Sequence, residues 1–567
     1  MPNFRYFFII IILLILQLLL AFQGIDVCDD GFVLTFYQQI FNDPSSVEYN
    51  FLYWFAGIVG GLWYQLFEDG GILWFRILAI IVNTTTLLVT YNLLKSFIKR
   101  DYLMLGLIMA LFVNDYGFLS FYHNQLTALL NVLLIATLYK ALKNNNSVLF
   151  ALVGFILSFT VFTRMPNLIL YALVLGIPFW NYLIDKSLVH FIKPIGLLVA
   201  GSVVGYVLIF LSLLTLGHLD IMKSAFVTVI DLGGTEESSH NFKDLIMVQF
   251  YNYLAIFIEL LKLGVFIVAI AIATKYLRYK GMFKWLTLGL TFLFFIYWFN
   301  TSNIYPVYAL CLVGSLVLSY RKAINVELRL ISFLSLISLL TISVGSAGGI
   351  NNSGFMAIWI GLPVFIHLVG TEPLFRNQIK VIDVKSLIWV FFMSFSCVKV
   401  YQLMHQAYFD PGLRTDKIYA INRDKAKFIY TTERRAKIIN DLLMQLENYV
   451  KPNDYLLAYD KMPMIHFLTE TRPYMYNPWV WIYDYNSFEK KLLKAEGEIK
   501  DLPIVVQQKF ETIYEFSEPQ PDYMATDKTN TDFHSNERNA SMKDFLERNN
   551  YTVVWSNDYF NIYKSEN

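Results

Sequence analysis

The stretch FRYFFIIIILLILQLLLAFQGIDVCDD, residues 4–30, decides how the rest of the chain is interpreted. One arginine is followed by an apolar run over residues 6–23, and then by Asp26, Asp29 and Asp30. A bilayer core about 30 Å thick needs roughly 20 apolar residues in a single helix. The run therefore predicts a membrane-spanning helix that is followed by an acidic loop at the membrane surface.

The composition extends this prediction to the whole chain. Of its 567 residues, 56% are hydrophobic and 16% are charged, whereas soluble domains carry about 25% charged residues. The mean hydropathy of +0.47 indicates many spans. A net charge of +1 with dispersed basic residues argues against a nucleic-acid groove. Three distant cysteines, Cys28, Cys311 and Cys397, support neither a disulfide framework nor a thiolate metal cluster.

Apolar runs of spanning length recur over residues 1–405 and predict thirteen membrane helices, so that the fold class is a mostly α, polytopic helical bundle. The expected spans are 6–23, 71–94, 103–120, 125–142, 147–163, 166–184, 194–217, 246–273, 285–300, 304–320, 330–345, 354–370 and 386–405.

Loop charges predict the orientation of these spans. Lys and Arg prefer cytoplasmic loops, and alternate loops are basic, as in Lys95, Lys99 and Arg100. The opposite loops are acidic, including the first one, residues 24–70. We therefore expect the N-terminus inside and the C-terminus outside. The first span could also be a cleaved signal peptide, because it follows a basic N-terminus. The length of its apolar run favours a retained helix.

One apolar segment, residues 51–67, is not counted as a span. It is 17 residues long, rich in aromatic residues and interrupted by Gly57, Gly60 and Gly61. Counting it would reverse the side of every later loop. We interpret it as an interfacial or re-entrant helix pair within the long first external loop.

Residues 406–567 are charged and patterned like a soluble domain. Apolar residues at helical spacing predict a helix over 433–449, and a second helix is expected near 541–549. Strand-like runs occupy 454–460, 511–516, 551–556 and 559–564. This segment is expected to be a small external α/β domain that follows the membrane domain of residues 1–405.

The acidic loop is the strongest candidate for chemistry. Acidic residues in an external loop can simply reflect topology. Alternatively, one of these carboxylates lies at the depth of the lipid headgroups, where a lipid-linked phosphate also lies, and this carboxylate removes a proton from an acceptor. A positioned base of this kind accelerates a reaction by roughly 10²–10⁴.

The overall layout and three segments resemble the GT-C class of membrane glycosyltransferases. The segments are CDDGFVLTFYQQI (28–40), FYHNQLTALLNVLLIATLYKAL (121–142) and TRMPNLIL (163–170). The resemblance implies a polyprenyl-phosphate-linked sugar donor, Asp29 as catalytic base and Asp30 as its helper or alternative, with neither cofactor nor metal. Many members have Asp-Glu where this chain has Asp-Asp with Asp26 nearby, so which acid acts stays open.

Four further residues are candidates for substrate binding, together with Asp26 as a positioning carboxylate. Arg164 lies in a turn that we expect to be external, where loop charges predict few basic residues. A guanidinium binds phosphate in a bidentate fork. The alternative is an arginine that pairs with headgroups. His123 stands at an external helix end, where a structural role is also common. Asn351 and Asn352 lie in the glycine-rich loop 345–354, which is either a sugar or phosphate site or a plain turn.

Taken together, the sequence predicts an inverting membrane glycosyltransferase on the external leaflet, in the inner membrane of a bacterium. Its expected partners are a polyprenyl-phosphate sugar, membrane lipids and an acceptor that is a glycolipid, a polysaccharide or a protein. A transporter or flippase is the alternative outside enzymology, although it should bury ionisable groups in mid-span, whereas the charges here gather at helix ends. A polysaccharide polymerase or ligase is the other alternative.

Overall fold

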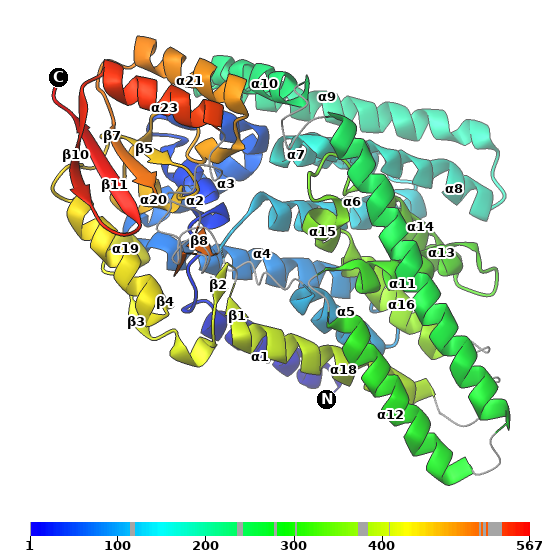
Figure 1. Cartoon of the computed structure of the whole chain (residues 1–567). Coiled ribbons are helices and arrows are strands. Elements are labelled where there is room, and N and C mark those ends of the chain that lie inside the picture. The colour runs from blue at the N-terminus through cyan, green and yellow to red at the C-terminus, as the bar shows by residue number, and fades with distance from the viewer. Residues whose placement is uncertain are drawn as a thin grey trace.

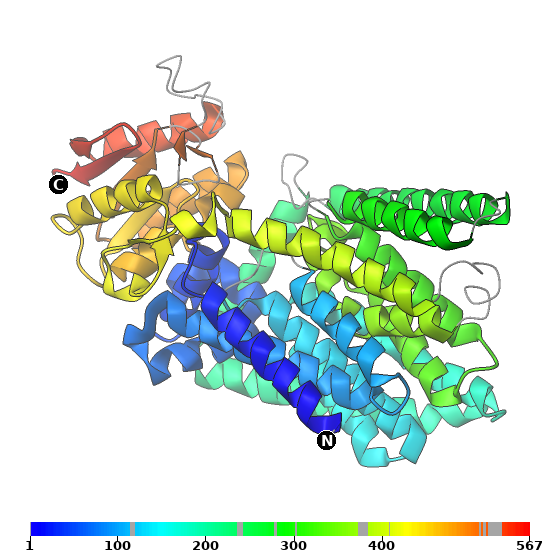
Figure 2. The same ribbon diagram turned by 90° about the horizontal axis from the view of Figure 1, so that it is seen from below.

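The computed structural model describes residues 2–113, 120–234, 242–276, 280–300, 303–371, 384–407, 409–509, 512–513, 518–519 and 536–567. A bundle of helices carries a small α/β part at one end, where the N-terminal helices α2 and α3 lie beside the C-terminal strands (Figure 1). Helices α11 and α12 lie along the edge of the bundle, as Figure 2 shows from below.

Each of the thirteen apolar runs contains helix. The helices are α1 (Pro2–Leu20), α4 (Gly71–Leu94), α5 (Arg100–Phe112), α6 (His123–Asn144), α7 (Ser147–Thr163), η3 (Met165–Leu175) with α8 (Gly176–Leu183), α9 (Ile192–Thr215), α11 (Phe242–Tyr276), α12 (Lys280–Phe299), α13 (Tyr305–Tyr320), α14 (Val326–Thr341), η5 (Gly354–Met356) with α16 (Ile358–Thr371), and α18 (Val384–His405). The expected span 103–120 runs into residues 114–119, which lie outside the described part.

Not all of these helices have the length of a span. Among the described residues, six helices are long and apolar enough to cross a membrane, or seven if the bent pair Gly349–Met356 and Ile358–Thr371 is one span. Four shorter apolar helices accompany them, and α5 has only 13 residues. The apolar helices therefore support a membrane protein, while the number thirteen and the orientation stay predictions.

The loop of residues 24–70 contains three consecutive helices, α2 (Asp29–Gln39), η1 (Pro44–Tyr53) and α3 (Trp54–Leu66), followed by the short η2 (Glu68–Gly70). The glycines that we expected to interrupt the segment lie inside the continuous helix α3. A Cβ at Gly57 would collide with Phe36, and one at Gly60 with Tyr37. These glycines therefore allow the aromatic residues of α2 to pack closely on α3.

The C-terminal part contains the expected helix α19 (Glu433–Leu446), the helix α23 (Asn536–Arg548) and a mixed five-stranded sheet. The strand order is β10-β11-β7-β5-β6, in which β5 pairs parallel with β6 and β7 while β11 pairs antiparallel with β7 and β10. The strands are β5 (Tyr455–Tyr459), β6 (Arg472–Pro473), β7 (Ile504–Gln508), β10 (Tyr551–Ser556) and β11 (Phe560–Ser565).

Several elements were not expected from the sequence, among them the strands β6 and β7 and three helices. Helices α20 (Met464–Thr469) and α21 (Tyr485–Glu498) lie in the C-terminal part, and α10 (Leu219–Gly234) lies in a segment that we interpreted as a loop. Side chains of α2, η1, α3 and α4 share one apolar core with α19, α20 and the sheet. The C-terminal part is thus packed directly against the acidic loop, and this contact gives it a role in holding that loop.

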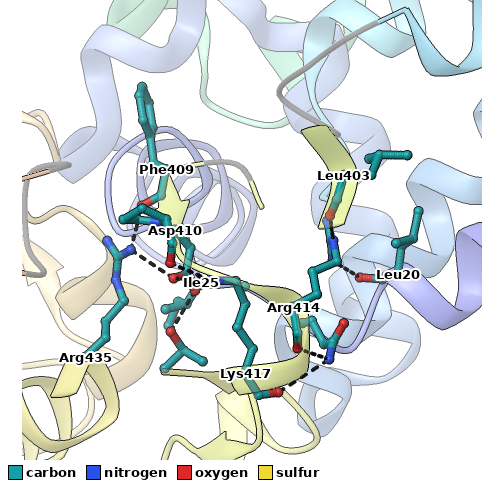
Figure 3. A network of polar contacts seen from close by, with 12 residues as sticks. Leu20, Ile25, Leu403, Phe409, Asp410, Arg414, Lys417 and Arg435 are labelled. Carbon is teal, nitrogen blue, oxygen red and sulfur yellow. Dashed lines mark hydrogen bonds and ion pairs between the residues drawn. The ribbon is translucent and has the colours of Figure 1, made fainter. Parts of the chain in front are cut away.

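A buried network of polar contacts joins the two parts of the chain around Asp410 (Figure 3). The Asp410 carboxylate accepts hydrogen bonds from Ile25 N (2.9 Å) and Thr431 Oγ1 (2.6 Å), and it pairs with Lys417 Nζ (2.9 Å) and Arg435 (3.2 Å). Burial raises the pKa of Asp410, but the Arg435 and Lys417 cations outweigh it and hold this pKa below its usual value.

A second group of contacts in Figure 3 connects the ends of the first and last long helices. The Arg414 guanidinium donates to the carbonyl oxygens of Leu403 and Leu20. Gln23 Nε2 donates to Arg414 O at 2.8 Å. Residues 20–25, which lead directly into the acidic loop, are therefore fixed by the segment that follows α18.

We expect Asp410→Asn to lower the free energy of unfolding by about 3–5 kcal/mol, because it leaves two buried cations without their counter-charge. Thermal or denaturant unfolding of the purified chain measures this loss. Because the folded pKa is lowered, the contribution of Asp410 is present above the ordinary carboxyl pKa and is lost as the pH falls through the lowered value. The exposed Asp416→Asn is the control, and equal stability of the two variants would contradict the expectation.

Candidate active site

Asp26 fixes the start of helix α2. Its carboxylate accepts hydrogen bonds from Cys28 N at 2.8 Å and from Asp30 N at 2.7 Å. Carboxylates are favoured there because the first N–H groups of a helix lack partners within the helix. Asp26 is only 2% exposed, and burial raises its pKa well above the usual value, with Asp30 and Asp29 acting in the same direction. Its contacts fit a positioning carboxylate.

Asp30 lies on the inner side of the first turn of α2. It is 5% exposed and accepts a hydrogen bond from Ser120 Oγ at 2.7 Å. Burial raises the pKa of Asp30, although the Arg76 guanidinium and the Ser120 hydroxyl act in the opposite direction. Asp30 is thus held in place by groups of the protein itself.

Asp29 differs from both neighbours because its side chain is partly exposed. It is the first residue of α2, where the helix dipole stabilises a negative charge. Burial raises the pKa of Tyr53, and the Asp29 carboxylate adds to this shift while the Arg164 guanidinium opposes it. Burial likewise raises the pKa of Tyr122, and Asp29 adds to it. The charges of Asp29 and Arg164 therefore both act on Tyr53 and Tyr122.

His123 and Arg164 complete this group. The His123 ring stacks on Tyr53 with a centroid distance of 3.8 Å and lies 4.1 Å from the ring of Tyr122. Arg164 is 5% exposed, donates to Ile342 O at 3.1 Å, and has its pKa lowered by burial. Candidates from residues 26–30, 123 and 164 thus come together, while the role of each stays a prediction.

Four residues of this site were not predicted. Arg76 donates to Ala21 O (2.6 Å) and Gly24 O (2.7 Å), and so holds the chain just before the acidic loop. Its signal in the sequence is a lone arginine inside the apolar run 71–94. Tyr53, Ser120 and Tyr122 gave no comparable signal, because they belong to aromatic or polar stretches whose partners are distant in sequence.

The C-terminal part supports the acidic loop from the other side. Met464 N donates to Val27 O at 3.0 Å, and the Cys28 thiol donates to Lys461 O at 3.2 Å. Gly31, in the first turn of α2, lies against the backbone of Pro463 and Met464. The turn between β5 and α20 therefore determines how far α2 can approach.

We expect Gly31→Ala to push the first turn of α2 away from α20, because its Cβ would overlap backbone atoms that cannot rotate aside. Overpacking of this kind typically costs about 1–3 kcal/mol. Transfer activity should also fall, because Asp29 and Asp30 lie in the displaced turn. Unfolding and activity assays measure both effects, with Gly497→Ala, where a Cβ meets open space, as the control. Unchanged stability and activity in Gly31→Ala would contradict this reading.

The glycine-rich loop, residues 345–354, approaches the site around Arg164 at its first residue, Gly345. Gly345 packs on Pro166, next to Arg164. Asn351 Oδ1 instead accepts from Ile304 N at 3.4 Å, and Asn352 is exposed and lies over Gly348. The contacts of these two asparagines therefore favour a structural turn, and their role in substrate binding stays a prediction.

Two further observations bear on the chemistry. Within the described residues, no group of three His, Cys, Asp or Glu side chains is arranged to hold a metal ion. Metal independence stays a prediction.

Glu259 is 8% exposed and lies halfway along α11, so the expectation that charges gather at helix ends is wrong at this position. Its carboxylate accepts from Trp298 Nε1 (2.6 Å) and pairs with Lys262 (2.7 Å).

No protein-family model matches the sequence, and no curated protein sequence matches it significantly. Among solved structures, ArnT from Cupriavidus metallidurans bound to undecaprenyl phosphate aligns with a TM-score of 0.42 at 12% identity, covering 99% of this chain and 98% of that one. The oligosaccharyltransferase of Archaeoglobus fulgidus tethered with an acceptor peptide aligns with a TM-score of 0.41 at 12% identity, covering 98% and 74%.

Proposed function

We propose that the chain is a membrane glycosyltransferase that moves a sugar from a polyprenyl-phosphate donor to an acceptor hydroxyl or amide. The observation that carries this proposal is the position of Asp29. It is the partly exposed member of an otherwise buried acidic group, and it shares the neighbourhood of Tyr53 and Tyr122 with Arg164. A base and a phosphate-binding cation whose charges act on the same two tyrosines suit transfer from a sugar phosphate.

Asp29 acts as the base in this proposal. It removes the proton from the acceptor as the acceptor atom bonds to the anomeric carbon. The bond from that carbon to the phosphate oxygen breaks at the same time, and the polyprenyl phosphate leaves with the electron pair. Phosphate is a good leaving group, so the reaction needs a base and compensating positive charge, not the acid and base pair of many hydrolases. A single displacement inverts the anomeric centre.

Arg164 supplies the compensating charge to the departing phosphate. Its burial strengthens this effect, because electrostatic interactions are larger where water is excluded. Asp26 and Asp30 keep the first turn of α2 in place through hydrogen bonds to Cys28 N, Asp30 N and Ser120. No metal ion or cofactor has a part in this mechanism.

The side of the membrane belongs to the same proposal. Acidic and basic loops alternate along the sequence, which favours an external position for residues 24–70 and 406–567. Their shared core agrees with placing both on one side. We place the protein in the inner membrane of a bacterium, with this side facing outward.

A panel of labelled donors tests the proposal. Membranes that contain the chain are supplied with polyprenyl-phosphate sugars, and nucleotide sugars are supplied separately under conditions that block lipid charging. We expect label to move from a polyprenyl phosphate to an acceptor. Transfer from nucleotide sugars alone would contradict the donor class.

Glu259 is the observation that favours a transporter instead, because ionisable residues in mid-span often mark transport pathways. Its pairing with Lys262 and Trp298 equally suits a purely structural role. Flux of labelled lipid-linked sugar into sealed vesicles, lost in Glu259→Gln but not in Asp29→Asn, would favour the transporter.

A further inference from the structure

A cavity of about 300 Å³ lies at the far end of α2, between α2, α3 and the C-terminal part. This volume is within the range of small-molecule sites. It is lined by carboxamide, carboxylate and aromatic side chains, among them Gln38, Gln65, Glu68, Tyr64 and Glu470. It plays no part in the mechanism above, because Gln38 follows Asp29 by nine residues, about 13 Å along the helix axis.

Gln38 indicates that the cavity binds a polar ligand. Its side chain is 7% exposed and lines the cavity, and its Oε1 atom has no hydrogen-bond partner. Its Nε2 donates to the Tyr64 hydroxyl and to Phe467 O, both at 3.4 Å. An unpaired buried amide oxygen costs roughly 1–3 kcal/mol, and a ligand that donates a hydrogen bond to this oxygen recovers that cost.

The lining also indicates the chemistry of the ligand. No Lys, Arg or His belongs to the described lining. The adjacent Lys425 is engaged by the protein itself: it pairs with Glu470 at 3.2 Å and donates to the Tyr64 hydroxyl at 3.3 Å and to Glu68 O at 2.9 Å. Phosphate or sulfate groups would meet carboxylates there. Amides and carboxylates suit hydroxyl groups, which both donate and accept hydrogen bonds.

We infer that this cavity binds a neutral sugar residue of an oligosaccharide. The cavity lies apart from Asp29, because residues 30–39 of α2 are buried between the two places, and its occupancy does not depend on the proposed function.

The test is binding of neutral oligosaccharides to the purified full chain in nanodiscs, without donor. The panel contains neutral hexose di- to tetrasaccharides, their phosphorylated counterparts and short peptides, measured by calorimetry or saturation-transfer NMR. We expect a neutral oligosaccharide to bind, and Gln38→Leu to weaken it roughly five- to tenfold, as expected for one or two lost hydrogen bonds. Because no transfer is measured, failure of the proposed function and failure of this site are distinguishable.

A second variant keeps the test valid if Gln38→Leu folds poorly. Gln65 is exposed on α3 and lines the cavity, so Gln65→Trp should fill it and abolish binding. Leu66 is exposed next to it and outside the lining, so Leu66→Trp should leave binding unchanged. The inference is overturned if no neutral oligosaccharide binds the folded chain, if both cavity variants bind normally, or if phosphorylated sugars or peptides bind in preference.

Discussion

Asp29→Asn should reduce the rate of sugar transfer by about 10²–10⁴ while leaving donor binding nearly unchanged. This is the usual contribution of a positioned general base, and an amide keeps the shape of the side chain but cannot accept the acceptor's proton. Because Asp29 is partly exposed at the start of α2, the substitution should not disturb folding. Single-turnover transfer and donor binding, measured on the purified variant, separate the two effects.

A matched control comes from the same loop, residues 24–70. Asp69 is exposed, lies in η2 (Glu68–Gly70), and is far from the start of α2 in the chain, so Asp69→Asn should transfer at the wild-type rate. Asp30→Asn should lose activity together with stability, because Asp30 is buried against Ser120. Full activity of folded Asp29→Asn would show that this carboxylate is not the base.

Arg164→Ala should lower kcat/KM for the donor by roughly 10- to 150-fold. A hydrogen bond to a charged group contributes about 1.5–3 kcal/mol, and the guanidinium is the cation whose charge acts on Tyr53 and Tyr122 together with that of Asp29. Arg164→Lys should recover part of the activity, because it restores the charge without the bidentate fork. Steady-state kinetics with varied donor concentration measure the change.

A structural role of Arg164 predicts a different result. The guanidinium also donates to Ile342 O, so the alanine variant should lose some stability in either case. If this were its whole role, kcat/KM per folded molecule would stay at the wild-type value and lysine would not rescue it. Competition by free polyprenyl phosphate adds a direct readout, since its inhibition constant should rise in Arg164→Ala.

The helices of the membrane part could be predicted because their signal is local. Every apolar run listed above contains helix. A segment that crosses lipid must be apolar over its length and must satisfy its backbone hydrogen bonds internally, so a long apolar run predicts a helix. The expected C-terminal strands 454–460, 551–556 and 559–564 were also found, for the same reason of local pattern. Helix α10 was missed because residues 219–234, which include Asp220 and Asp231, lie between two expected spans and were interpreted as a loop.

The candidate site could be predicted only in part. The cluster of aspartates in the sequence located the start of α2, and Arg164 stood out by its position in a turn. What holds these residues depends on partners far along the chain, such as Met464 for Val27 and Ser120 for Asp30. A single sequence has no local signal for such contacts, and therefore the support from the C-terminal part emerged only from the fold.

The most direct test of a single displacement assisted by Asp29 is the product formed by the purified chain from a polyprenyl-phosphate sugar of known anomeric configuration. We predict a product of opposite configuration by NMR, with one polyprenyl phosphate released for each sugar transferred. A product of retained configuration, or a folded chain that forms no product from any such donor, would contradict this mechanism.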